Sequence, residues 1–199
     1  TVVDHAADAE NALTYVELDL DGDGSKETFE IGSTLLIGSQ SADTITASDP
    51  DVSAVFIGNE GSDVLTGGDQ SDQLIGGKGA DTLNGGAGSD VLDGGAGNDT
   101  LYGGYGDDTL DGGTGTDTLT GGNGVDTFVL RSGDGSTTLA DADVIKDFTD
   151  GTDVLGMDDG LSFNELTIEQ GTGDYASHTL ISITATGEYL AILENTTAS

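Results

Sequence analysis

The chain from Gly58 to Val129 reads GNEGSDVLT, GGDQSDQLI, GGKGADTLN, GGAGSDVLD, GGAGNDTLY, GGYGDDTLD, GGTGTDTLT and GGNGVDTFV. These eight units are each nine residues long and follow one another without a gap. The sixth position is always aspartate, and the eighth is always leucine or phenylalanine. A tandem repeat of this regularity indicates a solenoid, in which each unit packs only against its neighbours.

Each unit predicts a turn followed by a short strand. Its first six residues are of turn type, and its last three, such as Thr82 to Asn84, suit a strand with one side chain facing inward. Two nine-residue units would then form one flattened coil, and stacked coils would form parallel sheets on two faces. The turns need glycine because they require positive φ angles and a close approach of carbonyl groups. We therefore predict an all-β fold.

Net charge restricts the partners of the chain. Asp and Glu number 38 against 4 Lys and Arg, which gives a formal charge of -34. Nucleic acids and anionic membranes are polyanions, so they are excluded as electrostatic partners, whereas multivalent cations are not. The chain has no cysteine and no stretch of about 18 apolar residues, which excludes thiolate metal sites and a transmembrane helix.

The repeated aspartates predict calcium sites. Stacked strands lie about 4.8 Å apart, and a calcium ion with oxygen ligands at about 2.3–2.6 Å can bridge carboxylates across that gap. Ligands that are all oxygen favour a hard cation, and the rigid octahedron of magnesium suits carbonyl ligands less well. The predicted carboxylates form two stacks, which are Asp63, Asp81, Asp99 and Asp117 on one edge and Asp72, Asp90, Asp108 and Asp126 on the other.

An earlier, weaker unit precedes the array. The nine residues from Gly38 read GSQSADTIT and keep Asp43 and Ile45, so we expect Asp43 to stack over Asp63 as a further ligand. The segment from Ala47 to Ile57 separates this unit from the others. These features divide the chain into an N-terminal β segment at 1–36, a degenerate repeat with an insertion at 37–57, the array at 58–129 and a C-terminal β cap at 130–199.

The units resemble the GGxGxDxUx pattern of the repeats-in-toxin (RTX) calcium-binding β-roll. This resemblance implies a right-handed parallel β-roll, in which each of several calcium ions is held by position-six carboxylates of two stacked turns and by backbone carbonyls of the glycine-rich turns. Departures occur at Asn59 and Gln70, where a glycine is missing, and we expect weaker binding there. The glycines implied as ligands are Gly76, Gly77, Gly79, Gly85, Gly86, Gly88, Gly94, Gly95, Gly97, Gly103, Gly104, Gly106, Gly112, Gly113 and Gly115.

A second acidic motif lies near the N-terminus. The residues from Asp19 to Glu30 fit the D-x-D-x-D-G pattern of an EF-hand loop, but the flanking residues alternate as strands and show no helical period. We predict a calcium loop between two strands, and the alternative is an acidic hairpin turn without an ion. Its ligands would be Asp19, Asp21, Asp23 and Glu27.

The C-terminal segment predicts a cap and an export signal. Residues 143–155 resemble the segment that follows the roll in RTX proteins exported by type I secretion. That resemblance implies a signal in about the last 60 residues, the type I secretion machinery as a partner, and a secreted or cell-surface location. The alternating stretches Leu166–Ile168, Thr179–Ile183 and Tyr189–Leu193 are predicted strands that cover the open end of the stack.

No motif in the chain indicates catalysis. The two histidines, His5 and His178, form no H-E-x-x-H motif, and the glycines around Lys78 lack the spacing of a phosphate loop. The sequence therefore favours a secreted, non-enzymatic calcium-binding module that folds on extracellular calcium. One alternative is a matrix, surface-layer or filament subunit that self-associates through calcium, and another is the export and folding module of a larger toxin or enzyme.

Overall fold

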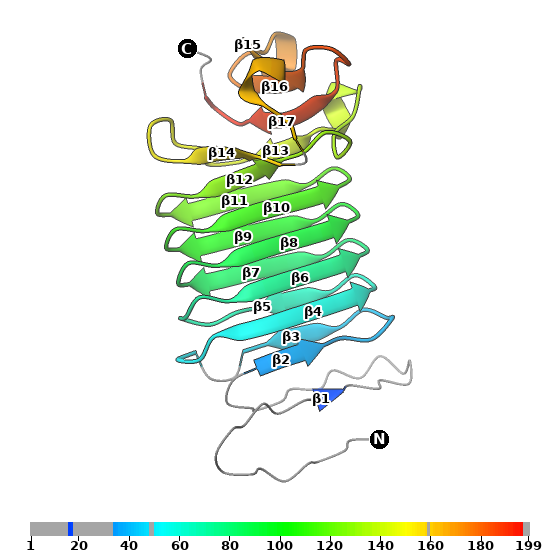
Figure 1. Cartoon of the computed structure of the whole chain (residues 1–199), viewed down its shortest axis with the longest axis vertical. Coiled ribbons are helices and arrows are strands. Elements are labelled where there is room, and N and C mark those ends of the chain that lie inside the picture. Colours follow the sequence, from blue (N-terminus) through cyan, green and yellow to red (C-terminus); the bar gives the residue numbers. More distant parts are fainter. Residues whose placement is uncertain (1–15, 18–33, 48–49, 159, 197–199) are drawn as a thin grey trace.

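The computed structural model describes residues 16–17, 34–47, 50–158 and 160–196. In this part of the chain, short strands stack along the long axis of the molecule, with the C-terminal segment at one end (Figure 1). The predicted all-β fold is confirmed, and the stacked parallel strands form the predicted β-roll. Among the described residues, no helix is long and apolar enough to cross a membrane.

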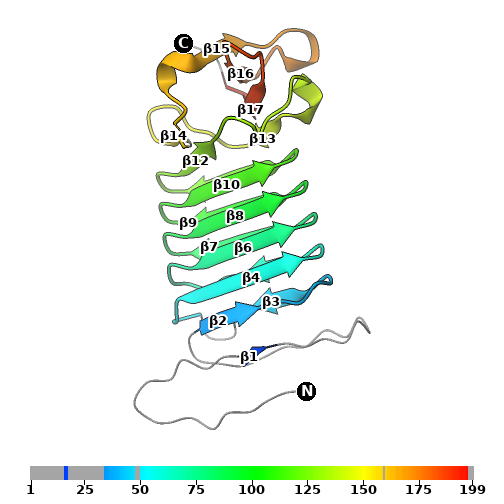
Figure 2. The same cartoon turned by 45° about the vertical axis from the view of Figure 1, so that its right-hand side comes forward.

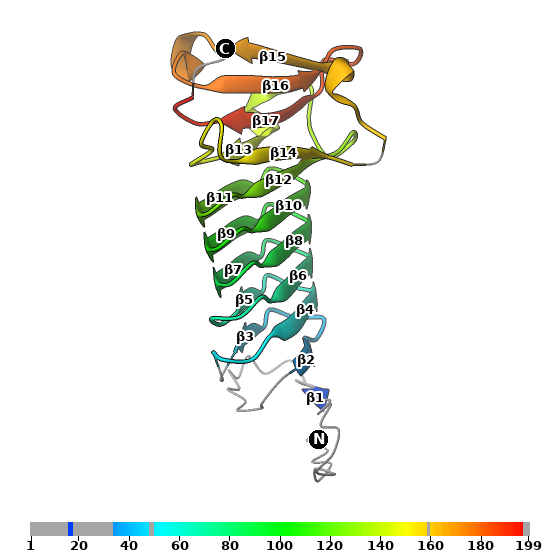
Figure 3. The ribbon, with the colours of Figure 1, turned by 60° about the vertical axis from the view of Figure 1, so that its left-hand side comes forward.

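The strands form two sheets, and the chain alternates between them through the roll, so that consecutive strands form one coil (Figure 3). The first sheet contains, in spatial order, β1 (Val16–Glu17), β2 (Thr34–Ile37), β4 (Ala54–Glu60), β6 (Gln73–Lys78), β8 (Val91–Ala96), β10 (Thr109–Thr114), β12 (Thr127–Leu130) and β14 (Val154–Met157). The second contains β15 (Leu166–Gln170), β16 (Thr179–Ile183), β17 (Tyr189–Leu193), β13 (Asp143–Ile145), β11 (Thr118–Asn123), β9 (Thr100–Tyr105), β7 (Thr82–Ala87), β5 (Val64–Thr66) and β3 (Thr44–Thr46).

Most strands of the roll are longer than the three residues that we predicted. Strand β7 continues from Thr82 through both following glycines to Ala87, and its register with β9 pairs Leu83 with Leu101 and Gly86 with Gly104. Glycines that stack on glycines let the parallel ladder continue, because no side chain separates the backbones. The turn between two strands is therefore shorter than predicted.

The core of the roll is a single file of apolar side chains between the two sheets. The leucines at position eight of consecutive units, from Leu65 to Leu110, are 0% exposed, and Phe128 closes the file in the last unit. One inward side chain per nine residues makes a thin core, so apolar burial contributes less to stability than in an ordinary domain of this length.

The roll begins earlier than the array of regular units. The segment that we predicted to be an insertion, Ala47 to Ile57, contains the first part of β4, which pairs in parallel with β2 and β6 and directs Phe56 into the core beside Leu74. An apolar residue in the inward position was enough to continue the stack without the glycine pattern.

The C-terminal segment covers the last coil (Figure 2). Strand β13 adds to β11 and β14 adds to β12, both in parallel. Strand β17 then pairs in parallel with β13, and β16 and β15 follow as antiparallel strands. Three short 3-10 helices, η1 (Leu139–Asp141), η2 (Phe163–Glu165) and η3 (Gly173–Tyr175), connect the described strands of this cap.

Candidate metal centres

The position-six aspartates form two columns along the roll, one beside each row of turns. From the second aspartate of each column onward, the carboxylate accepts a hydrogen bond through Oδ1 from the backbone N–H of the aspartate one coil earlier, as in Asp81 N to Asp99 Oδ1 at 2.8 Å and Asp90 N to Asp108 Oδ1 at 2.8 Å. Asp43 joins the first column, because its N–H donates to Asp63 Oδ1 at 2.7 Å. All nine of these aspartates are buried, which are Asp43, Asp63, Asp72, Asp81, Asp90, Asp99, Asp108, Asp117 and Asp126.

Two further aspartates extend the columns into the cap, and the sequence analysis did not assign them as ligands. Asp143 Oδ1 accepts the N–H of Asp117 at 2.9 Å, and Asp153 Oδ1 accepts the N–H of Asp126 at 3.1 Å. Their separations of 26 and 27 residues from those donors differ from the 18 residues that separate stacked aspartates within the roll. The signal that could have found them is an aspartate followed two residues later by an apolar side chain, Ile145 or Leu155, as in the repeats. At the other end, Ala54 donates its N–H to Asp72 Oδ1 but brings no carboxylate.

The second carboxylate oxygen distinguishes regular turns from irregular ones. In the regular turns Oδ2 is buried and has no hydrogen-bond partner, and this holds for Asp63, Asp81, Asp90, Asp99, Asp108 and Asp117. In irregular turns Oδ2 instead accepts the N–H of the residue four positions earlier, at 2.6 Å from Ser39 to Asp43 and from Gly68 to Asp72. A buried carboxylate oxygen without a partner is costly, so the regular turns call for a cation or a proton.

The first glycine of each regular unit leaves open the space in front of that oxygen. A Cβ atom on Gly76 would lie 2.5 Å from Asp81 Oδ2 and 2.7 Å from the carbonyl oxygen of Gly94 in the next coil. The two oxygens are thus at most about 5 Å apart, a span that one calcium ion with ligands at about 2.3–2.6 Å can bridge. The same arrangement recurs in the regular units at Gly58, Gly85, Gly94 and Gly103, and Gly67 shows it in the irregular turn of Asp72. Carboxylate and carbonyl oxygens that converge on an open space are suitable ligands for calcium.

The remaining predicted glycines bring carbonyl groups into rows beside the carboxylates. Gly79 has φ +135°, and a Cβ there would overlap the carbonyl oxygen of Gly61 in the coil before. The second-position glycines Gly77, Gly86, Gly95, Gly104 and Gly113 and the fourth-position glycines Gly79, Gly88, Gly97, Gly106 and Gly115 all have positive φ and approach a carbonyl of the preceding coil.

Comparison with protein families gives one match, to the RTX calcium-binding nonapeptide repeat, over residues 57–92, 66–101, 84–119, 93–128 and 102–136. The chain contains RTX calcium-binding repeats. No curated protein matches the chain. Among solved structures, the extracellular lipase LipA from Serratia marcescens matches with 18% identity and a TM-score of 0.37 over 90% of this chain, which spans 40% of the lipase. The match to the RTX calcium-binding repeat identifies calcium as the ligand of these repeats, as predicted.

The two departures from the RTX pattern differ in their consequences. Asn59 adopts φ 78°, as a glycine would, and its Nδ2 donates to the carbonyl of Gly38 at 2.7 Å. The Oδ2 atom of Asp63 in that turn remains without a partner. In the turn that contains Gln70, the N–H of Gly68 occupies Asp72 Oδ2 instead. Only the second departure removes the free oxygen of the RTX turn.

Burial raises the pKa of seven of the column carboxylates, which are those of Asp63, Asp81, Asp90, Asp99, Asp108, Asp117 and Asp126. The pKa of Asp90 and that of Asp99 rise to about 7, first because burial removes water from the charged group and second because of the stacked aspartates above and below. The hydrogen bond from the backbone N–H opposes this rise but does not cancel it. Within the described part of the chain no three acidic or imidazole side chains gather around one point, so an ion in the roll depends on carbonyl ligands as well.

One group of predicted ligands cannot be placed. Asp19, Asp21, Asp23 and Glu27 of the N-terminal acidic motif lie outside the described residues.

Proposed function

We propose that this RTX chain is a secreted calcium-binding module that is unfolded at cytosolic calcium concentrations and folds on extracellular calcium. The observation that carries the proposal is the set of buried Oδ2 atoms in the regular turns, which have no hydrogen-bond partner and, at Asp63, Asp81, Asp90, Asp99 and Asp108, face a glycine carbonyl of the next coil. Metal binding then supplies free energy of folding, since the site does not exist in the unfolded chain.

The charge distribution supports this coupling. With a formal charge of -34 and only 4 basic side chains, the chain cannot neutralise its stacked aspartates internally. Without calcium, folding would bury like charges one coil apart at the cost of their hydration. The thin apolar core offers little to offset that cost.

In this proposal, calcium ions bind at the regular turns. Each would take Oδ2 of a position-six aspartate, a carbonyl of the first glycine one coil ahead, and further carbonyls from the second and fourth glycines. The turn of Asp72 would bind more weakly, because backbone N–H groups already occupy both of its carboxylate oxygens. In Asp43 the N–H of Ser39 occupies Oδ2, but Oδ1 has no partner.

We further propose that the chain is exported and acts outside the cell or at its surface. The stacked strands of the cap are consistent with a folded end to an exported chain, and type I secretion machinery is the proposed partner. The role is structural rather than enzymatic, and neither nucleic acid nor membrane insertion is part of it, in keeping with the net charge.

A calcium titration of the whole chain, followed by far-ultraviolet circular dichroism and light scattering, tests this function. We expect a cooperative gain of β-structure with calcium and a poor response to an equal concentration of magnesium. Equal folding by magnesium would show that screening of charge, rather than coordination, drives folding. A calcium-dependent rise in scattering that tracks the gain of structure would favour the filament or surface-layer alternative.

A further inference from the structure

The strands of the second sheet carry no charge along the roll. Every residue of β3, β5, β7, β9 and β11 is uncharged, although the chain has 38 acidic side chains. Figure 3 shows these strands along one side of the roll, with the cap confined to its end. We call the outward side chains of these five strands the neutral face.

The neutral face carries polar groups in two regular rows. Side chains on either side of an inward leucine point outward, because successive side chains of a strand alternate between its faces. The register of β7, β9 and β11 aligns Thr82, Thr100 and Thr118 in one row and Asn84, Tyr102 and Thr120 in the other. Neighbours in a row are one coil apart, which is about 4.8 Å. Hydroxyl and amide groups therefore repeat along the axis of the roll at the spacing of the coils.

These polar side chains are available to a ligand. Within the described part of the chain, none of the six forms a side-chain hydrogen bond or an ion pair. Tyr102 is 44% exposed, and Tyr105, at the end of the same strand, is 67% exposed. Tyrosine offers a large amphipathic contact area and loses little conformational entropy when a partner binds. The centre of the neutral face thus combines an aromatic platform with free hydroxyl and amide groups.

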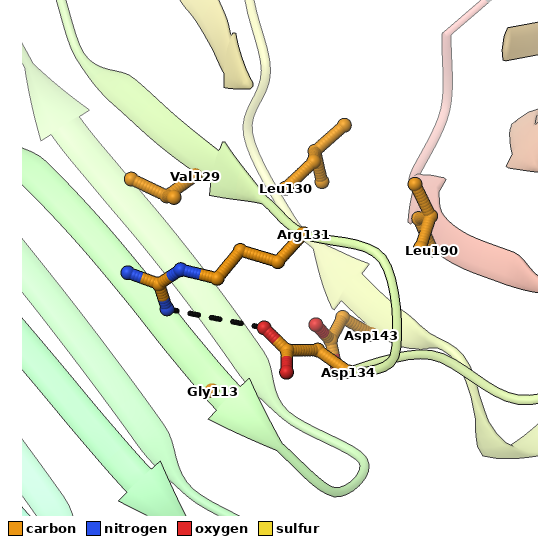
Figure 4. A pocket seen from close by; sticks show the side chains of 7 residues that line it. All are labelled: Gly113, Val129, Leu130, Arg131, Asp134, Asp143 and Leu190. Carbon is orange, nitrogen blue, oxygen red and sulfur yellow. Dashed lines mark ion pairs between the residues drawn. The ribbon is translucent and has the colours of Figure 1, made fainter. Parts of the chain in front are cut away.

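The first sheet is different, because its strands carry charge. Glu60, Lys78, Asp93 and Asp111 lie in β4, β6, β8 and β10. Near the cap, Arg131 forms ion pairs with Asp111 and Asp134, and Figure 4 shows Asp134 turned toward the guanidinium group beside Gly113 of β10. A cationic partner would be attracted to this sheet and to the acidic turns rather than to the neutral face.

We propose that the neutral face binds an uncharged, linear polysaccharide. A pyranose ring presents C–H groups that can pack on the electron-rich face of a tyrosine ring. Its hydroxyl groups can bond to threonine and asparagine side chains, and an extended chain that lies along the two rows meets a new pair of them at every coil. A polyanionic polysaccharide is disfavoured by the formal charge of -34. The inference goes beyond the proposed function, since none of the six side chains is an assigned calcium ligand.

Affinity electrophoresis of the whole chain tests the proposal. Native gels with excess calcium would contain either hydroxyethylcellulose, which is an uncharged linear glucan derivative, or carboxymethylcellulose, which has the same backbone but is polyanionic. We expect hydroxyethylcellulose to retard the chain and carboxymethylcellulose to retard it less. No retardation by hydroxyethylcellulose, or stronger retardation by carboxymethylcellulose, would overturn the proposal. Because calcium is in excess throughout, the result does not depend on whether calcium or apolar burial drives folding.

A variant without the two tyrosines locates the binding surface. Tyr102→Thr combined with Tyr105→Asn introduces the residues that the next coil carries in the same register, Thr120 and Asn123, so the roll should keep its fold and its circular dichroism spectrum. Loss of two ring contacts should weaken binding to hydroxyethylcellulose at least about five-fold. Phe163→Ser is the matched control, because it removes an aromatic side chain of the cap that is 63% exposed, and its retardation should not change. Unchanged retardation of the folded double variant would overturn the proposal.

A second copy of the chain is the competing occupant of the neutral face. Sedimentation velocity in calcium distinguishes the two, and we expect the same sedimentation coefficient for the unaltered chain and the double variant. A dimer of the unaltered chain that the double variant abolishes would assign the face to self-association and would overturn the proposal.

Discussion

Neutralising Asp99 should raise the calcium concentration needed for folding. Asp99 is 2% exposed, its Oδ1 accepts the N–H of Asp81, and its Oδ2 faces the space in front of Gly94 without a partner. Asp99→Asn preserves an acceptor for Asp81 but replaces the charged ligand with a neutral amide. Removing one partner of a buried charge interaction costs about 3–5 kcal/mol. If roughly six ions are taken up in one transition, this cost raises the calcium midpoint about two- to four-fold.

Asp107→Asn is the matched control for this experiment. Asp107 is the neighbour of a position-six aspartate but is exposed, and its Oδ1 accepts the N–H of Val125 at 2.8 Å, a contact that asparagine can keep. Both variants remove one negative charge, so a general change in repulsion affects them alike. A surface change of this kind is worth less than about 0.5 kcal/mol, and the midpoint should move by less than about 1.2-fold. Equal midpoints for the two variants, measured by circular dichroism in calcium titrations, would refute the assignment of ligands.

Three other perturbations test separate parts of the structure. In the presence of a chelator, lowering the pH from about 7.5 to about 5 should increase the content of β-structure. The pKa values of Asp99 and Asp63 in the folded state, about 7 and about 6, lie above the ordinary value for aspartate, so the calcium-free roll gains stability as these groups take up protons. A loss of circular dichroism signal at the lower pH would contradict this. Gly94→Ala should impair calcium-driven folding more than Gly156→Ala. A methyl group at Gly94 would lie 2.6 Å from the Gly112 carbonyl oxygen and 2.7 Å from Asp99 Oδ2, whereas at Gly156 its nearest neighbour is the side-chain methyl group of Thr127 at 3.0 Å. The reverse order of calcium midpoints would count against the proposed ion position. Truncation after Leu130 removes β13 to β17 and exposes the edges of β11 and β12. We therefore expect a higher calcium midpoint for folding and more light scattering from aggregation. An unchanged midpoint would show that the cap does not stabilise the roll.

The parts of the fold that follow the nonapeptide period could be predicted from the sequence. Aspartate at position six and leucine at position eight define the units, and each coil contains two of them. Residues 18 positions apart are therefore expected to stack, and Leu83 accordingly pairs with Leu101. The strands were predicted too short because glycine has low intrinsic strand propensity, yet in a stack it continues the ladder. The aspartates that extend the columns at other than the 18-residue spacing, Asp143 and Asp153, were missed. Asp143 reaches its column only through the conformation of the non-repeated residues that precede it, which no periodic pattern encodes.

The irregular turns show a further limit of pattern reasoning. The sequence marks Asn59 and Gln70 as equivalent departures, but asparagine tolerates positive φ and preserves the turn, whereas the turn with Gln70 directs the N–H of Gly68 to Asp72. The division of the chain into four segments, the N-terminal acidic loop and the export signal remain predictions.

Hydrogen exchange of the position-six amides tests the central claim most directly. In the roll, the N–H groups of Asp63, Asp81, Asp90 and Asp99 donate to buried carboxylates one coil ahead, so their protection reports whether the aspartate columns are assembled. Residue-resolved exchange measured by NMR at neutral pH should show strong protection of these amides in calcium and exchange near the unfolded rate in chelator. Equal protection in both solutions, with calcium removal verified, would contradict the claim that calcium holds the roll together.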